Sequence, residues 1–311
     1  MNREQSIHQY ASTLGFDRCG IARCRPFEER RDQLQQWLDQ GHHGGLTYME
    51  RNLDKRLDPT LLVEGARSII VCAISYKRPP AQGLITRFAS YAWGRDYHSV
   101  LKEKLRALFA HIQELIPNTT GRLFVDTAPI LEKSWAAEAG VGRIGRNSLL
   151  IVPGIGSFVV LGLIVTNAEL EPDTPLSPID PCGNCRACVE ACPVGAIGPN
   201  RTIDASRCIA RRTIEAEPDN EGELHGWIFG CDTCQQVCPH NRHAPVSPHT
   251  CFAPTPGLAE MTANDWLQLT DEEFKHRFRD TPLLRCGLQR IQKRIHELQD
   301  IAYPAHSIPS K

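Results

Sequence analysis

Eight of the thirteen cysteines stand at spacings that can hold iron–sulfur clusters. The first run is Cys182-x2-Cys185-x2-Cys188-x3-Cys192, followed by Pro193, which is the ligand spacing of bacterial two-cluster ferredoxins. Three thiolates spaced this closely can wrap one [4Fe–4S] cubane, while the fourth cysteine of such a run binds the other cluster. Proline suits the first turn of the helix expected after Cys192, because no amide donor is needed there.

A second, split run supplies the remaining ligands. It reads Cys231-x2-Cys234-x3-Cys238, again followed by proline, and Cys208 stands twenty-three positions before Cys231. With the crossing known from ferredoxins, the sequence predicts two [4Fe–4S] clusters: cluster 1 on Cys182, Cys185, Cys188 and Cys238, and cluster 2 on Cys208, Cys231, Cys234 and Cys192. Structural zinc is the alternative, but zinc ribbons use two separated CxxC pairs and leave the repeated Cys-Pro ending unexplained.

Composition and charge indicate a metal-binding protein of about two domains from a reducing compartment. The 311 residues are 41% hydrophobic and carry 35 basic against 36 acidic side chains, so a packed core is feasible and no global field favours nucleic acid. The N-terminus has no signal segment, and the most apolar stretch, residues 149–165, is interrupted by proline and glycines. It is shorter than the roughly 20 residues of a membrane helix, so we expect a cytoplasmic location and no membrane partner.

Helices and strands must position any chemistry in the first part of the chain. The patterns predict a buried strand over residues 67–77, a strand over 123–125 and a hairpin over 148–165, with helices over 7–14, 27–40, 97–116 and 130–139. A proline-rich linker follows at 169–181, and two more helices are expected near 262–278 and 282–298. The expected fold class is α+β, with an α/β domain at residues 1–175, a two-cluster ferredoxin-like domain at 176–245 and a C-terminal helical segment at 246–311.

Other motifs of the first domain have both functional and structural interpretations. Residues 140–145 match the G-x-G-x-x-G fingerprint, but the flanking elements come in reverse order, so a loop near a bulky ligand, or a plain turn, fits better than NAD binding. Asp126 ends a strand, where carboxylates often face ligand crevices, and capping of the next helix is the alternative. Asp96 and His98 begin a D-x-H-x-x-G-like sequence that ends in Leu101, so we expect a helix cap there and no cobalt-ligating histidine.

Basic side chains gather in two parts of a chain whose formal net charge is −1. Seven lie between Lys275 and Arg294 against one acid, Asp280, and a second group lies between Arg201 and Arg212. Such runs often form solvated helix faces, but they are also what contacts with a phosphate backbone require. A nucleic-acid partner would therefore bind at these two parts of the chain.

Three segments read together give the chain a family resemblance. They are residues 90–98 (SYAWGRDYH), 124–132 (FVDTAPILE) and 142–150 (GRIGRNSLL), and they precede the split cluster run, with residues 204–209 (DASRCI) between its halves. In this combination the chain resembles the epoxyqueuosine reductases, the iron–sulfur and cobalamin enzymes of tRNA queuosine synthesis. The resemblance covers nearly the whole chain.

The resemblance implies a reaction and its cofactors. The substrate would be epoxyqueuosine at the wobble position of tRNAs with GUN anticodons, and two-electron removal of the epoxide oxygen would give queuosine and water. The N-terminal domain would bind cobalamin, as in reductive dehalogenases, and an external low-potential donor of the flavodoxin or ferredoxin type would feed the clusters. Asp126 matches the family's proton donor, which we expect to be held protonated in a partly desolvated pocket. We expect the protein to be a monomer.

The resemblance also implies which residues bind the corrin and the tRNA. The expected corrin contacts are Arg56, Tyr91, Asp126, Gly145, Arg146, Asn147, Ser148, Leu150 and Asp232. The expected tRNA contacts come from the two basic parts of the chain and are Arg207, Arg211, Arg285, Arg290 and Arg294. Longer family members carry further C-terminal helical repeats, so the resemblance defines the grip on tRNA less well.

Two other functions remain open on the sequence. A ferredoxin-like electron-transfer protein would use both clusters but would not need the domain at residues 1–175. A cobalamin-dependent reductive dehalogenase would share the cofactors, but such proteins are usually exported, and no export signal is visible here.

Overall fold

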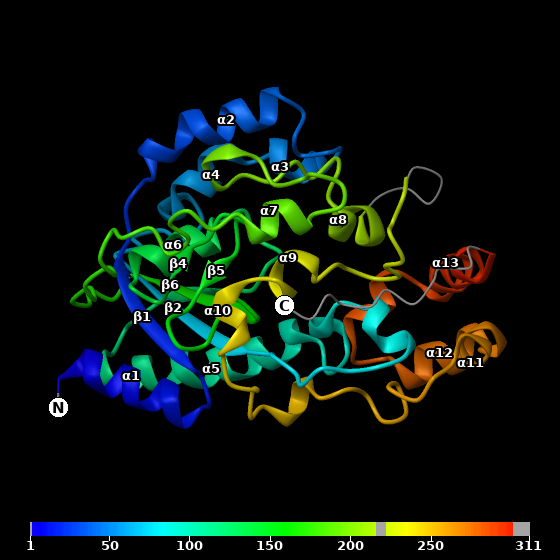
Figure 1. Ribbon diagram of the computed structural model, residues 1–311. Coiled ribbons are helices and arrows are strands. Elements are labelled where there is room, and N and C mark those ends of the chain that lie inside the picture. Colours follow the sequence, from blue (N-terminus) through cyan, green and yellow to red (C-terminus); the bar gives the residue numbers. More distant parts are fainter. Residues whose placement is uncertain (1, 216–221, 301–311) are drawn as a thin grey trace.

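A four-stranded antiparallel sheet forms the centre of the N-terminal half in the computed structural model, which describes residues 2–215 and 222–300 (Figure 1). The strand order is β1-β2-β6-β3, with the bounds β1 Arg18–Arg23, β2 Ser68–Ser75, β6 Val159–Thr166 and β3 Gly121–Phe124. Every residue of β2 is buried, which suits its β-branched composition, because a strand covered on both faces needs no polar side. The strands β1 and β3 form the two edges.

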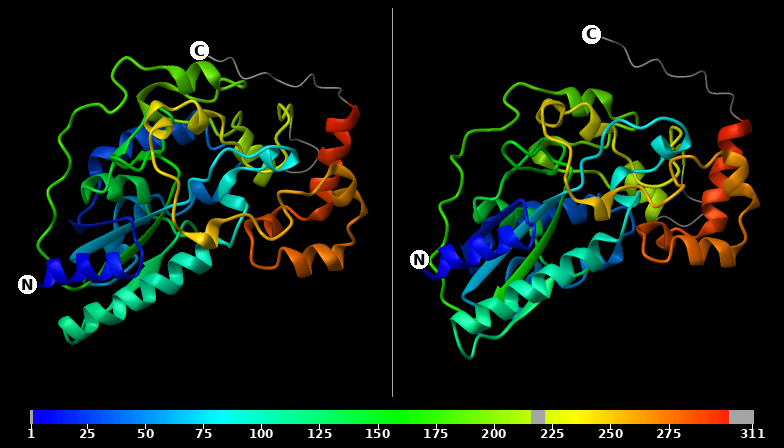
Figure 2. Two further views of the ribbon diagram at one scale, coloured as in Figure 1. Left: turned by 60° about the horizontal axis from the view of Figure 1, so that its bottom comes forward. Right: turned by 90° about the horizontal axis from the view of Figure 1, so that it is seen from below.

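Helices cover both faces of this sheet (Figure 2). The helices α1 (Arg3–Thr13) and α5 (Tyr97–Leu115) pack on one face, and α6 (Glu132–Glu138) packs on the other through the buried Trp135. Gly162 of β6 allows α5 to approach, because a Cβ there would lie 2.7 Å from Leu105 Cδ1. The shorter helices of this half are α2 (Arg31–Asp39), α3 (Thr47–Glu50) and α4 (Leu53–Leu57).

The hairpin expected over residues 148–165 is wrong. The strand β5 (Leu150–Ile151) pairs with β4 (Arg143–Ile144) in a separate two-stranded ribbon, while β6 pairs with β2 and β3. The amide of Gly145 donates to Leu149 O at 2.8 Å and closes the turn between β4 and β5. After β5 the chain turns again, and β6 begins only at Val159. The glycine-rich sequence is thus the turn of a small ribbon.

The cluster segment is built from short helices joined by turns. These are α7 (Ala187–Ala191), α8 (Ile209–Ile214), α9 (Thr233–Gln236) and α10 (Pro239–Arg242). Pro239 stands in the first turn of α10, as its missing amide allows. No helix follows Pro193, contrary to expectation, because the amide of Gly195 donates to Cys192 O at 3.1 Å and closes a turn.

Helices at the C-terminal end pack against two earlier segments of the chain. The helix expected over residues 262–278 is two helices, α11 (Ala263–Gln268) and α12 (Asp271–Arg277), because Thr270 starts a second capping box. Together with α13 (Leu288–Asp300) they share a core with residues 85–93 and with Phe229. Within the described ranges, no helix is both long enough and apolar enough to cross a membrane.

Candidate active site

Four of the expected cluster cysteines are neighbours beside α7. Burial raises the pKa of the Cys188 thiol, and the charges that raise it further are those of Cys182, Cys238 and Cys185. Burial raises the pKa of Cys238, and the charges of Cys182 and Cys185 raise it further. The structure therefore brings Cys238, from the second run, to the first three cysteines of the first run. Cys185 is the exposed member of this group.

The other four cysteines form a second group around α9. Burial raises the pKa of Cys234, with further contributions from the charges of Cys231 and Cys208. The charge of Cys192 acts on Cys208, so this group includes the last cysteine of the first run. The charge of Cys188 makes a smaller contribution to the raised pKa of Cys234, which indicates that the two groups are adjacent. This agrees with the packing of α7 against α9.

The turn between β4 and β5 touches both cysteine groups. The amide of Arg146 donates to Cys182 Sγ at 3.2 Å, and its guanidinium donates to Cys185 O at 3.0 Å. Asn147 is buried, and its Nδ2 donates to Cys234 O at 3.4 Å. Hydrogen bonds to a cluster sulfur and to ligand carbonyls are the contacts that fix and tune such a site.

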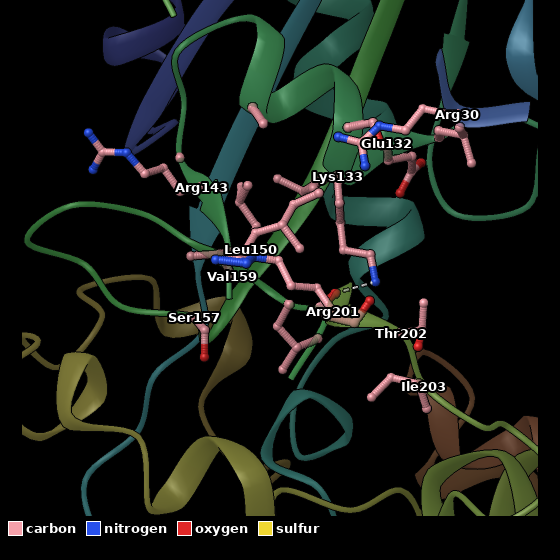
Figure 3. A pocket seen from close by; sticks show the side chains of 18 of the residues that line it. Arg30, Glu132, Lys133, Arg143, Leu150, Ser157, Val159, Arg201, Thr202 and Ile203 are labelled. Carbon is pink, nitrogen blue, oxygen red and sulfur yellow. Dashed lines mark hydrogen bonds between the residues drawn. The ribbon is translucent and has the colours of Figure 1, made fainter. Parts of the chain in front are cut away.

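A cavity of about 960 Å³ opens beside this turn (Figure 3). Its apolar walls include Ile130, Leu131, Leu150, Val159 and Leu161, and its cationic side chains are Arg30, Arg56, Lys133, Arg143 and Arg201. Five of the nine expected corrin residues line it, namely Arg56, Tyr91, Asp126, Ser148 and Leu150. The remaining four, Gly145, Arg146, Asn147 and Asp232, do not line it. Arg146 and Asn147 donate to the cluster loops instead.

Asp232 is a buried structural carboxylate in this fold. Its Oδ2 accepts hydrogen bonds from the amide and the hydroxyl of Ser90, at 2.7 and 2.8 Å. Burial raises the pKa of Asp232, and the bonds from Ser90 oppose that shift. The contact ties the cluster segment to the turn that carries Tyr91, and Gln235 Nε2 links Asp232 to the hydroxyl of Tyr76, which also lines the cavity.

Arg56 has an unsatisfied donor at the edge of the large cavity. Its side chain is 7% exposed, one guanidinium nitrogen donates to Tyr48 O at 2.8 Å, and Nε has no hydrogen-bond partner among the described residues. Burial lowers the pKa of Arg56. A buried donor without a partner is costly, so this site suits a ligand that brings an acceptor oxygen.

Asp126 lies in a loop between two cavities. Besides the large one, it lines a smaller cavity of about 260 Å³. Its backbone is left-handed, with φ of 58°, its amide donates to Glu132 Oε1 at 2.7 Å, and its Oδ2 accepts from the Tyr97 hydroxyl at 2.7 Å. Since Leu131 precedes the first residue of α6, Asp126 is not the cap of that helix.

The pKa values of His98 and Asp126 are shifted in opposite directions, which favours a protonated His98 beside an ionised Asp126. The nearby His98 ring lowers the pKa of Asp126, against the effect of burial, and the hydrogen bond from Tyr97 adds to the shift. Burial opposes protonation of His98, yet the carboxylates of Asp126 and Asp96 raise its pKa to about 9. His98 Nε2 lies 3.5 Å from Asp126 Oδ2, and Nδ1 lies 2.7 Å from Asp96 Oδ1. In this arrangement the pKa of Asp126 is shifted in the direction opposite to the one expected for a protonated carboxyl.

Glu132 is a second group beside Asp126 with a raised pKa. Burial, followed by the charge of Asp126, raises the pKa of Glu132 to about 8. Sequence reasoning missed Glu132, Tyr97 and His98 as site residues, although all three stand in the segments that carried the family resemblance. Asp96 caps α5 as expected, since its side chain accepts from the His98 amide at 2.9 Å.

The smaller cavity connects Asp126 with one of the basic parts of the chain. Aromatic and charged side chains line it, among them Tyr91, His98, Glu215, Phe229, Arg279 and Arg285. Arg285 forms an ion pair with Glu215 across it. This cavity could receive a planar base, and it shares Tyr91, Tyr97 and Asp126 with the large cavity.

The five expected tRNA contacts differ in exposure. Arg207 and Arg285 are exposed, and Arg211 and Arg290 are half-buried. Arg294 is 1% exposed, and its guanidinium donates to Ile228 O, so its expected phosphate contact is wrong. The helix α13 turns this residue into the C-terminal core.

Known proteins resemble the chain along nearly its whole length. The family described as epoxyqueuosine reductase QueG, DUF1730, matches residues 56–127, and the 4Fe-4S double cluster binding domain matches residues 181–241. A curated relative from Leadbetterella byssophila, named epoxyqueuosine reductase, is 39% identical over 96% of this chain and 98% of its own length.

Solved structures share the fold. The structure of epoxyqueuosine reductase from Streptococcus thermophilus matches with a TM-score of 0.85 and 30% identity, over 95% of this chain and 80% of that one. A crystal structure of epoxyqueuosine reductase with a tRNA-Tyr epoxyqueuosine-modified tRNA stem loop matches with a TM-score of 0.84 and 30% identity, over 94% of this chain and 79% of that one. The expected α+β fold and the two [4Fe–4S] clusters are confirmed by these matches.

Proposed function

This chain belongs to the epoxyqueuosine reductase family, and we propose that Asp126 delivers a proton to the epoxide, between a corrin in the large cavity and the base in the small one. The enzyme reduces epoxyqueuosine in tRNA to queuosine. The observation that carries the proposal is that Asp126 lines both cavities. A simple electron-transfer protein would need neither cavity, and the relatives favour this reduction over dehalogenation.

The reaction defines what the protein must supply. Two C–O bonds break, a C=C bond forms, and the oxygen leaves as water after taking up two protons, with two electrons entering the carbon framework. Electrons must therefore reach the carbon atoms of the epoxide, and protons must reach its oxygen. Asp126 lines both the large cavity, which opens beside the turn that touches the clusters, and the smaller cavity, which suits this division.

The large cavity fits a corrin by its size and by its side chains. Its apolar walls suit a macrocycle, and its cationic side chains suit the amide and phosphate groups of cobalamin. The Nε of Arg56 offers a donor that no described residue uses. When bound, cobalamin would supply a strongly reducing cobalt centre. We assign Arg56, Tyr91, Ser148 and Leu150 to its binding, and we assign the turn at residues 145–147 to the clusters.

Asp126 and His98 form the proton-delivery pair. His98 holds the proton, because two carboxylates flank its ring and raise its pKa to about 9. As the epoxide oxygen develops negative charge, the proton passes to it through the Asp126 carboxyl, and Asp96 keeps the imidazolium in place. Glu132, with a pKa of about 8, can replace the proton after each turnover.

The smaller cavity is proposed to admit the modified base. Tyr91 and Tyr97, two half-buried residues of its wall, offer aromatic rings for stacking, as proteins use for bases taken out of a nucleic-acid stack. Arg285 and Arg290 would bind phosphates near its mouth, with Arg207 and Arg211 on the cluster side. Because the substrate is tRNA, we expect the reaction to take place in the cytoplasm. Arg294 is buried and is not assigned to tRNA binding.

Electrons are proposed to enter at cluster 1 and leave from cluster 2. Cys185 of cluster 1 is exposed, which gives an external low-potential carrier access. The charge of Cys234, in cluster 2, contributes to the pKa of Lys133, and Lys133 lines the large cavity. The charge of Cys188 contributes to the raised pKa of Cys234, as expected for two adjacent clusters. The route thus runs from the surface to the cavity, with Cys238 and Cys192 as the crossed ligands.

Corrin binding at the large cavity tests this proposal directly. Leu150→Trp should fill the cavity and abolish retention of cobalamin, as measured by the visible spectrum of the corrin after gel filtration. Leu61→Trp, at a residue that is 55% exposed outside the cavity, is the matched control and should retain it. Anaerobic enzyme should form queuosine from a modified stem loop only with cobalamin present. Turnover by corrin-free protein, or full retention by Leu150→Trp, would contradict the assignment.

A further inference from the structure

Two cysteines outside the clusters lie opposite each other on neighbouring strands, at one edge of the main sheet. Cys19 of β1 stands opposite Cys72 of β2, and their sulfurs are 3.8 Å apart (strands in Figure 1). The pair is of the non-hydrogen-bonded kind, because the amide of Ile21, two residues on, points outward to Asp173 Oδ2 at 2.8 Å. Such pairs have Cα atoms about 4.5 Å apart, which is within the range that a disulfide spans.

Cys19 also lies beside a charged histidine. His8 of α1 contacts Asp173 with Nε2 to Oδ2 at 3.0 Å, and both side chains are about one-third exposed. The hydrogen bond with Asp173 and a second one with Cys19 raise the pKa of His8. Asp173 is itself fixed to the outer edge of β1, since its amide donates to Ile21 O at 2.9 Å. Asp173 thus holds the His8 imidazolium at the outer edge of β1, where its charge contributes to the lowered pKa of Cys19.

These contacts favour a thiolate at Cys19 and a thiol at Cys72. The hydrogen bond donated by Cys72 lowers the pKa of Cys19 against the effect of burial, and His8 adds to this shift. Cys72 is fully buried, and burial raises its pKa. A half-exposed thiolate next to a buried thiol is the arrangement of an attacking and a resolving cysteine.

We propose that Cys19 and Cys72 form a thiol-modification site that reacts with small-molecule disulfides and closes into a cross-strand disulfide. The Cys19 thiolate attacks one sulfur of the reagent, a mixed disulfide forms, and the first reagent thiolate leaves. The Cys72 thiol then attacks the Cys19 sulfur, loses its proton, and releases the second reagent thiol. The protein dithiol is oxidised by two electrons, and the reagent disulfide is reduced to two thiols.

Peptide mapping of the intact enzyme tests this proposal. The anaerobic cluster-loaded protein is treated with one equivalent of 4,4′-dithiodipyridine and digested with trypsin. The expected product links the peptide of residues 19–23 (CGIAR) to that of residues 68–77 (SIIVCAISYK), with the loss of two hydrogens. Two thiopyridones should be released for each linked pair. Reaction at the cluster cysteines before Cys19, or a mixed disulfide on Cys19 that never resolves, would overturn the proposal.

Cys24 serves as the matched internal control. It follows β1 and is half-buried like Cys19, but burial raises its pKa to about 12. Cys19 should react about tenfold faster or more, since its thiolate fraction is far larger. Cys72→Ser should trap the reagent on Cys19, and Cys19→Ser should leave Cys72 unmodified. Equal rates at Cys19 and Cys24 in the wild-type chain, which needs no variant to fold, would refute a special reactivity.

Discussion

The Tyr97 hydroxyl donates a 2.7 Å hydrogen bond to Oδ2 of Asp126. This bond ties the first turn of α5 to the loop between the two cavities. The same oxygen faces His98, so one carboxylate oxygen meets both a phenol and an imidazolium. The side chain of Asp126 is 53% accessible because it faces the two cavities. Tyr97 thus positions the proton donor, while His98 stores the proton.

The rate of epoxide reduction should fall as pH rises through about 9. The folded-state pKa of His98 is about 9 against an ordinary value of 6.5, so its proton is present below that range and is lost above it. The same shift stabilises the fold fully below pH 6.5, and this stabilisation disappears as pH passes 9. Single-turnover rates of prereduced enzyme between pH 6 and 10 measure the effect.

Two variants separate His98 from its neighbour in that pH profile. His98→Asn should remove the alkaline limb and lower the rate, whereas Glu132→Gln should keep a limb near pH 9. An acidic midpoint near 4 in the wild-type profile would show instead that Asp126 titrates without His98. A limb that moves with Glu132→Gln would assign the proton to Glu132, whose own pKa is about 8.

The crossed cluster ligands predict selective losses. The reconstituted protein should hold about eight iron and eight sulfide per chain. Cys192→Ala should damage cluster 2, although Cys192 adjoins the ligands of cluster 1 in sequence, and Cys238→Ala should damage cluster 1. Cys251→Ala, outside both groups, is the control. Cluster-resolved EPR of the reduced variants measures the outcome, and the opposite assignment of the two losses would disprove the crossing.

Binding of tRNA should depend on salt through Arg285 and Arg290. Each lost phosphate contact lowers the slope of log affinity against log salt by about 0.7 to 0.9, so the double glutamine variant should lose about twice that. Arg294→Met should instead lower the melting temperature and leave the slope unchanged, because its guanidinium lies in the core. Affinity measured at several salt concentrations decides this, and an unchanged slope in the double variant would place the phosphate grip elsewhere.

Local sequence pattern predicted the buried elements and missed those made by long-range contacts. The strand β2 can be recognised from the sequence, because its residues 69–74 form an unbroken apolar run that is buried on both faces. Edge strand β1, with arginine at both ends, carries no such signal. The false hairpin arose because β6 pairs with strands far away in the chain. Thr270 could have been recognised as a helix start from the glutamate three residues later.

The same limits apply to the candidate site. Cysteine spacing alone predicted both ligand groups, because a cubane fixes the distances between its thiolates. The end of a strand made Asp126 a candidate, and the family resemblance gave it the role of proton donor. Its pKa depends on His98, whose approach the sequence does not reveal. Arg294 looked like its basic neighbours, and only the carbonyl of Ile228, sixty-six positions away, explains its burial.

The reactivity of Asp126→Asn in a single turnover is the most direct test of the central claim. The amide keeps the size of the side chain and can still accept from Tyr97, so corrin content and both cluster signals should match the wild type. Prereduced variant and wild type are mixed with an epoxyqueuosine-modified stem loop, quenched over time and analysed for queuosine by mass spectrometry. We predict a rate lower by about 10²–10⁴-fold, the usual contribution of general acid catalysis. A rate close to that of the wild type would contradict proton delivery by Asp126.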